Sequence, residues 1–177
     1  DLAPGDFVVV DQYIDRTFAR PKSFFGSGCV AHVAFSHPTC ARLSDACIRA
    51  GEDAGIRIHK GGTYLAMEGP QFSTLAESRM YREVCKAKVI GMTGMREAKV
   101  ACWAGVCVAV ATVIGTPTGY ASKAKSLVAR LPGILGADRQ PCPHGCDRAL
   151  EHAFMTAPDK RDAELLAKLD AVAGRVL

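Results

Sequence analysis

The sequence predicts an α/β fold with a mixed, largely parallel β-sheet flanked by helices. Short apolar runs, such as residues 7–10 and 106–113, are typical of strands that a sheet buries on both faces. Between these runs lie longer segments in which apolar residues recur every three or four positions, as in amphipathic helices. Strands that alternate with helices in this way indicate an α/β architecture.

The strands are expected where continuous apolar or β-branched runs lie between turn-forming residues. In chain order these runs occupy residues 7–10, 56–58, 63–67, 88–92 and 106–113. A turn at Gly61-Gly62 separates the second strand from the third.

The helices are expected where apolar residues repeat on one face, at residues 39–54, 75–86, 97–103, 122–131 and 162–172. Thr39 is a favourable N-cap for the first helix, and Gly55 would end it. Residues 16–28 and 132–158 lack this periodicity and are expected to be loops. The first of these loops carries three phenylalanines among glycines and serines, so another surface is expected to cover it.

The composition is that of an ordinary globular domain. A length of 177 residues favours a single domain over residues 1–177, and a hydrophobic content of 49% is enough for a sizeable core. The net charge of +4 comes from scattered lysines and arginines, with no basic block interleaved with aromatic residues, so no nucleic-acid partner is expected. The mild basic excess suits an anionic co-substrate.

Cysteine usage indicates a reducing compartment. The eight cysteines are irregularly spaced, and Cys47, Cys85, Cys102 and Cys107 lie in apolar patterns where a free thiol acts as a small hydrophobe. The sequence shows no signal peptide and no apolar run of transmembrane length. A cytoplasmic protein with no membrane partner is therefore expected.

One cysteine cluster raises the alternative of a zinc site. Cys142, His144 and Cys146, with His152 beyond them, offer three or four ligands. The two cysteines do not have CxxC spacing, however, and no second pair follows. A loop with unpaired thiols is the favoured interpretation, and no metal is expected.

Four segments resemble a known family: DQYIDRT at residues 11–17, FFGSGCVAH at 24–32, EGPQFS at 68–73 and GMTGMREA at 91–98. Each is a modest signal alone. Their order and spacing, with AES at residues 76–78 after the third, resemble the S-methyl-5'-thioadenosine phosphorylases, which are trimeric relatives of purine nucleoside phosphorylases. The resemblance covers most of the chain, is weaker after Pro132, and implies a nucleoside phosphorylase-like fold.

The resemblance implies phosphorolysis of S-methyl-5'-thioadenosine to adenine and S-methyl-5-thioribose 1-phosphate, a pentosyl transfer in purine and methionine salvage. Inorganic phosphate is then the co-substrate, with no metal or organic cofactor. As the glycosidic bond breaks, the sugar gains oxocarbenium character and the departing purine must be stabilised. A hydroxyl at a strand-to-helix turn suits the phosphate, because helix N-terminal amides also favour an anion.

The resemblance assigns roles to five residues of this sequence. Thr93 is the phosphate donor, and Met92 lies against the ribose. Phe72 stacks on the base, as aromatic faces can, with Ser73 near the base edge. His32 reaches the 5' end of a nucleoside held by a neighbouring subunit, so a homotrimer is implied. Without the resemblance, Thr93 would be interpreted as a helix N-cap, Phe72 as a core residue and His32 as an ordinary histidine.

Two parts of the family's active site have no counterpart here. The family's N-terminal phosphate loop, with its Arg-His pair, matches nothing in residues 1–177. The family also carries a Thr-Asp pair whose aspartate protonates the purine, whereas this sequence runs on from Thr112 into residues that match a later helix. The catalytic aspartate loop is therefore expected to be deleted after Thr112, and no catalytic residue is assigned.

Two alternatives to methylthioadenosine phosphorolysis stay open. One is a phosphorylase for another purine nucleoside, including a 6-oxo purine, because the residue that distinguishes these bases belongs to the absent loop. The other is an inactive fragment that binds nucleosides weakly or assembles with full-length subunits.

Overall fold

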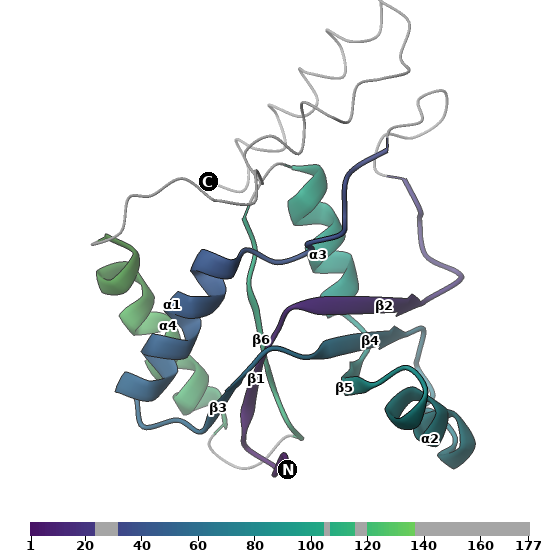
Figure 1. The fold of residues 1–177 in the computed structure, drawn as a ribbon, viewed down its shortest axis with the longest axis horizontal. Coiled ribbons are helices and arrows are strands. Elements are labelled where there is room, and N and C mark those ends of the chain that lie inside the picture. Colours follow the sequence, from purple (N-terminus) through teal and green to yellow (C-terminus); the bar gives the residue numbers. More distant parts are fainter. Residues whose placement is uncertain (24–31, 105–106, 116–119, 137–177) are drawn as a thin grey trace, which may run out of the picture.

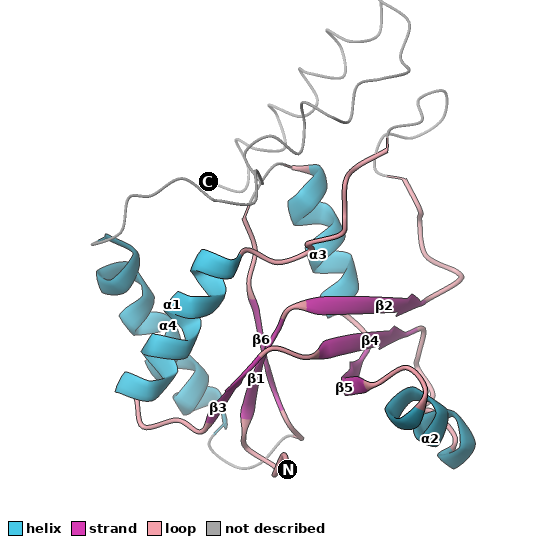
Figure 2. Ribbon diagram, in the orientation of Figure 1, coloured by secondary structure: helices cyan, strands magenta, loops and turns pink. Residues whose placement is uncertain are grey.

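The computed structural model describes residues 1–23, 32–104, 107–115 and 120–136. Strands occupy the middle of the molecule and helices surround them (Figures 1 and 2). In chain order the elements are β1 (Phe7–Val10), β2 (Gln12–Arg16), α1 (Ala41–Asp53), β3 (Ile58–Lys60), β4 (Thr63–Met67), α2 (Leu75–Glu83), β5 (Ala87–Gly91), α3 (Gly94–Trp103), β6 (Val110–Val113) and α4 (Tyr120–Gly136).

The strands form two three-stranded sheets, ordered β3-β1-β6 and β2-β4-β5. β1 runs parallel to β3 and antiparallel to β6, whereas β4 runs parallel to both of its neighbours. The chain passes twice from the first sheet directly into the second. Asp11 alone separates β1 from β2, and residues 61–62 separate β3 from β4. This arrangement confirms an α/β fold with mixed, largely parallel strand pairing.

The core sits on both faces of β1, whose four residues are all buried. Side chains alternate along a strand, so Val8 and Val10 join one apolar cluster while Phe7 joins another. The first cluster also contains Tyr64 and Val89 of the β2-β4-β5 sheet. The second receives α1 and α4, which pack side by side in Figure 1.

The fold brings the carboxyl ends of three parallel strands to one edge. In the strand register, Arg16 at the end of β2 lies opposite Met67 of β4, and Ala66 of β4 lies opposite Gly91 at the end of β5. The segments that leave these strands therefore meet, and ligands of α/β proteins bind at such edges.

Two strand predictions need correction. The strand expected at residues 56–58 forms at Ile58–Lys60, and the one expected at residues 106–113 forms at Val110–Val113 within the described residues. β2 was not expected at all, because its residues QYIDR lack an apolar run. Its pairing along the whole of β4 supplies the backbone bonds that a weak local pattern does not predict.

The four described helices occur in the predicted order, whereas the fifth predicted helix lies outside the described residues, and some of the predicted ends were wrong. Cys40, not Thr39, is the N-cap of α1, and its side chain makes no capping hydrogen bond. α4 continues through Pro132, where a loop was expected, because Leu131 and Ile134 pack on the second apolar cluster. Tertiary packing thus outweighs the local cost of proline.

Several predictions concern residues outside the described part of the chain. These are Phe24, Phe25, the cysteine cluster at 142–146 and the helix at 162–172. Among the described residues, none of the five cysteines forms a disulfide, and no group of three metal-ligating side chains occurs. No helix in the described ranges is both long and apolar enough to cross a membrane.

Candidate active site

An open cleft of about 530 Å³ lies where β4 and β5 end. One wall is the segment that follows β4, and the other is the turn from β5 into α3 together with the first turn of that helix. The lining residues are Arg20, Glu68, Gly69, Pro70, Met92, Thr93, Arg96 and Glu97.

Thr93 stands at the N-cap position of α3, as the strand-to-helix pattern predicts. It is exposed, and its side chain makes no capping hydrogen bond to the helix. Its hydroxyl therefore remains available to a ligand in the cleft. The helix N-terminus and the exposed Arg96 both add positive potential beside it, which favours an anion.

Met92 connects the two walls. Gly69 has a φ of +72°, which favours glycine, and a Cβ at this position would lie 2.7 Å from the Sδ atom of Met92. The Met92 side chain thus packs directly over the Gly69 backbone. A larger residue at position 69 would push it into the cleft.

Phe72 and Ser73 follow the cleft wall but do not line it. The Phe72 ring is 84% exposed, and the Ser73 and Ser78 hydroxyls are 2.8 Å apart. Thr74 then begins α2 with a capping box, in which its side chain and that of Glu77 each accept a hydrogen bond from the other's backbone amide. Glu77 therefore caps α2 and does not line the cleft.

His32 is exposed and lies outside the cleft lining. The structure therefore brings Met92 and Thr93 together on the wall that follows β5, places Phe72 and Ser73 just beyond the wall that follows β4, and leaves His32 outside the cleft lining.

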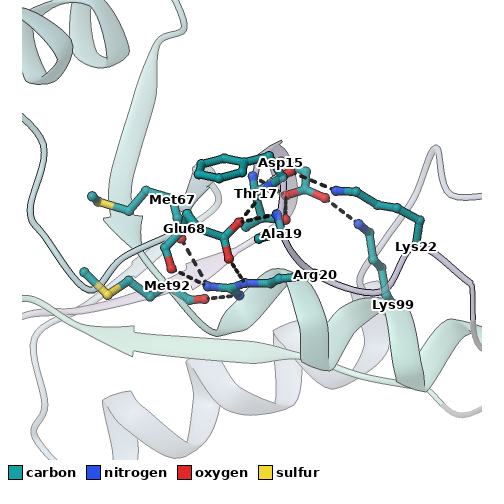
Figure 3. Close-up of polar contacts among 10 residues, drawn as sticks. Asp15, Thr17, Ala19, Arg20, Lys22, Met67, Glu68, Met92 and Lys99 are labelled. Carbon is teal, nitrogen blue, oxygen red and sulfur yellow. Dashed lines mark hydrogen bonds and ion pairs between the residues drawn. The ribbon is translucent and has the colours of Figure 1, made fainter.

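Arg20 and Glu68 form a polar network between the strand ends (Figure 3). The Arg20 Nε atom lies 3.2 Å from Oε1 of Glu68, and its two terminal nitrogens donate to backbone carbonyls of Met67, Glu68 and Met92. Glu68 Oε2 accepts from the amides of Phe18 and Ala19, at 2.6 and 3.1 Å. These amides, followed by Arg20, hold the pKa of Glu68 below its ordinary value.

A second network ties β2 to α3 beside the cleft. The Asp15 carboxylate pairs with Lys99 and accepts hydrogen bonds from the amide and hydroxyl of Thr17 (Figure 3). Burial by itself raises the pKa of Asp15, but the bonds from Lys99 and Thr17 outweigh it and lower the pKa to about 2. The Asp15 carboxylate therefore stays charged at neutral pH, and its bond to Lys99 ties β2 to α3, whose first turn lines the cleft.

Of the eight cleft residues, only Met92 and Thr93 had roles assigned from the sequence. Glu68, Gly69, Pro70, Arg96 and Glu97 lie in the family-like segments without an assigned role, and Arg20 lies outside those segments. Arg96 and Glu97 lie one helical turn from Thr93, so the expected strand-to-helix turn could have suggested them. Arg20 lies in an aperiodic loop, and its partners are 47 to 72 positions away.

Comparisons with known proteins agree with this geometry. The family model of the Phosphorylase superfamily matches residues 1–128. The chain is 58% identical to the S-methyl-5'-thioadenosine phosphorylase of Cereibacter sphaeroides and 50% identical to that of Bradyrhizobium diazoefficiens, each over 100% of this chain and 67% of the relative. The chain belongs to the S-methyl-5'-thioadenosine phosphorylase family. Enzymes of this family are pentosyltransferases.

A solved structure supports the same assignment. The methylthioadenosine phosphorylase from an Antarctic soil metagenomic library superposes with a TM-score of 0.83 at 32% identity, over 96% of this chain and 66% of that one. The chain spans about two thirds of the length of these phosphorylases. The Cereibacter alignment covers 196 positions for 177 residues, so about 19 aligned positions of that relative have no counterpart in this chain.

Proposed function

We propose that this protein, completed by the segments that its relatives carry, catalyses phosphorolysis of S-methyl-5'-thioadenosine. The observation that carries the proposal is the strand-end cleft, which Thr93 lines from the N-terminus of α3, without a capping bond from its side chain, together with Glu68–Gly69–Pro70. Such a helix end suits a phosphate, and the wall continues directly to Phe72, an aromatic face for a purine.

In the proposed reaction, a phosphate oxygen forms a bond to C1' of the ribose while the bond from C1' to the purine nitrogen breaks. The electron pair of the broken bond leaves with the purine, which takes up a proton. Thr93 donates a hydrogen bond to the attacking phosphate, and Met92 packs against the sugar. Phe72 stacks on the base, with Ser73 near its edge.

A homotrimer belongs to this proposal. Phe18 is 79% exposed at the start of the segment that leads to His32, and His32 is itself exposed. In the proposed assembly this segment packs on a neighbouring subunit, and His32 contacts the 5' substituent of the neighbour's nucleoside. The thiols and the proposed salvage reaction favour a cytoplasmic location.

The test compares two polypeptides for adenine release from methylthioadenosine and phosphate. One is the 177-residue chain, and the other is a chimera that adds the Cereibacter relative's unmatched third and its roughly 19 internal positions. The chimera should be active. The chain alone should show negligible turnover, because lost acid catalysis is worth about 10²–10⁴-fold in rate.

Either of two results would contradict the proposal. A folded chimera without activity would refute the assigned reaction, and faster turnover of inosine than of methylthioadenosine would favour a 6-oxo purine. Normal turnover by the 177-residue chain would show instead that the absent segments are dispensable.

A further inference from the structure

We propose that Arg20 is a positioning residue that holds the two walls of the cleft in register, an inference that rests on the proposed phosphorolysis. Three segments far apart in the sequence meet at its side chain: the loop after β2, the end of β4 and the end of β5. Figure 3 shows the guanidinium between these segments.

The guanidinium bonds to both walls at once. One terminal nitrogen donates to the Met92 carbonyl on the β5 wall. The other donates to the carbonyls of Glu68 and Met67 on the β4 wall, at 2.9 and 3.3 Å, and Nε donates to the Glu68 carboxylate at 3.2 Å. A single side chain thus serves four acceptors on two strand ends.

This geometry requires arginine. Its donors are fixed in one plane as a rigid fork, so bonds in several directions order the acceptors relative to one another. A lysine ammonium is a compact point charge and cannot reach four acceptors spread over two walls. The Arg20 side chain is only 21% exposed, which shields these bonds from competing water.

Glu68 supplies the second half of the arrangement. Its Oε2 atom accepts from the amides of Phe18 and Ala19, which fixes the loop that carries Arg20. These bonds also lower the pKa of Glu68, so its carboxylate stays ionised at neutral pH and pairs with the Arg20 guanidinium.

The two walls carry different parts of the proposed reaction. Met92 and Thr93, on one wall, would hold the sugar and the nucleophile, while Phe72, beyond the other wall, would hold the leaving base. Their separation decides whether phosphate reaches the sugar in line with the departing purine. A misplacement of about 1 Å can cost about 10²-fold in rate.

The first test uses hydrogen–deuterium exchange on the 177-residue chain. Arg20→Met should speed exchange about tenfold in both residues 67–72 and residues 92–95, since bonds to a charged donor are lost from each wall. Arg20→Lys should not restore protection, and α1 and α4 should stay unchanged. The matched control is Arg82→Met, because the Arg82 side chain is 74% exposed and its ion pair is with the neighbouring Glu83 on the same helix.

Three exchange results would overturn the inference: no change in either wall, a change in one wall only, or an equal rise throughout the chain. Glu68→Gln provides a second variant if Arg20→Met fails to fold. It keeps the three carbonyl acceptors of Arg20 and should speed exchange in the same two segments to a smaller extent.

The second test measures kinetics on the active chimera. Arg20→Met should lower kcat by about ten- to a hundredfold while the dissociation constant for adenine changes little, because orientation is lost and not the base contact. An unchanged kcat would overturn the positioning role even if exchange rises. If the parent chimera is itself inactive, the proposed function fails, and the exchange experiment still decides whether Arg20 joins the walls.

Discussion

Phe72 and Thr93 share a property that matters at the scale of single residues: neither is used by the fold of this chain. Phe72 is 84% exposed, and Thr93 is exposed without capping its helix. Substitutions at exposed positions usually change stability by less than about 0.5 kcal/mol. A loss of function at either residue would therefore report on ligand contact.

In the active chimera, Phe72→Ala should raise KM for the nucleoside, and Thr93→Val should chiefly raise KM for phosphate. The stacking face of Phe72 is worth about 0.5–1.5 kcal/mol beyond its buried area. The Thr93 hydroxyl bonded to an anion is worth about 1.5–3 kcal/mol. Steady-state kinetics with each substrate varied in turn gives the KM for nucleoside and the KM for phosphate in each variant. If the two KM values change equally in both variants, the separate roles of Phe72 and Thr93 are refuted.

The cleft residues that were predicted from the sequence and those that were missed differ in how far away their contact partners lie along the chain. Thr93 follows a strand and precedes a helix, so its place at a helix N-terminus was predictable from local pattern, whereas its role toward phosphate was implied by the family resemblance. Arg20 contacts carbonyls more than 45 positions away, and carbonyls carry no sequence signature. Only the folded backbone shows which arginine reaches them.

At the scale of elements, the passage from β5 into α3 depends on Gly91. A Cβ there would lie 1.9 Å from the Tyr64 hydroxyl oxygen, which is fixed because Tyr64 is only 4% exposed. The same hydroxyl accepts a hydrogen bond from the Gly94 amide at 3.4 Å. The turn that carries Thr93 therefore packs against Tyr64, which leaves no room for a side chain at position 91.

Gly91→Ala should lower the free energy of unfolding by about 1–3 kcal/mol, the usual cost of overpacking. Gly133→Ala is the matched control, because this residue is inside α4 and, apart from its neighbours and the backbone of its own helix, no described atom lies within 4 Å of its added Cβ. The control should raise stability by about 0.5–1 kcal/mol. Urea unfolding of the two variants is the measurement, and a Gly91→Ala variant as stable as its parent would contradict the argument.

Element predictions succeeded where one chemical pattern dominated and failed where packing decided. β1 is a run of four apolar residues and was placed correctly. β2 was missed because its mixed sequence forms a strand through its pairing with β4. α4 continues past Pro132 because the residues around this proline pack on the second apolar cluster.

At the scale of the whole molecule, the described residues expose large apolar side chains near the strand ends. Phe18 and Phe72 are 79% and 84% exposed, and both lie in loops that leave the strand ends. The chain spans about two thirds of its relatives, so either further chain or a second subunit could supply the cover. If the 177-residue chain associates with itself, a second subunit supplies the cover.

We expect the 177-residue chain to form trimers at micromolar concentration through the segment from Phe18 to His32. Burying a phenylalanine is worth about 1.5–3 kcal/mol, so Phe18→Ser should weaken association measurably. Val128→Ser is the control, because Val128 is 60% exposed but lies on α4, away from β2 and the loop that follows it (Figure 1). Light scattering coupled to size exclusion gives the mass of each. A monomeric parent, or equal weakening by both substitutions, would show that this segment does not form the interface.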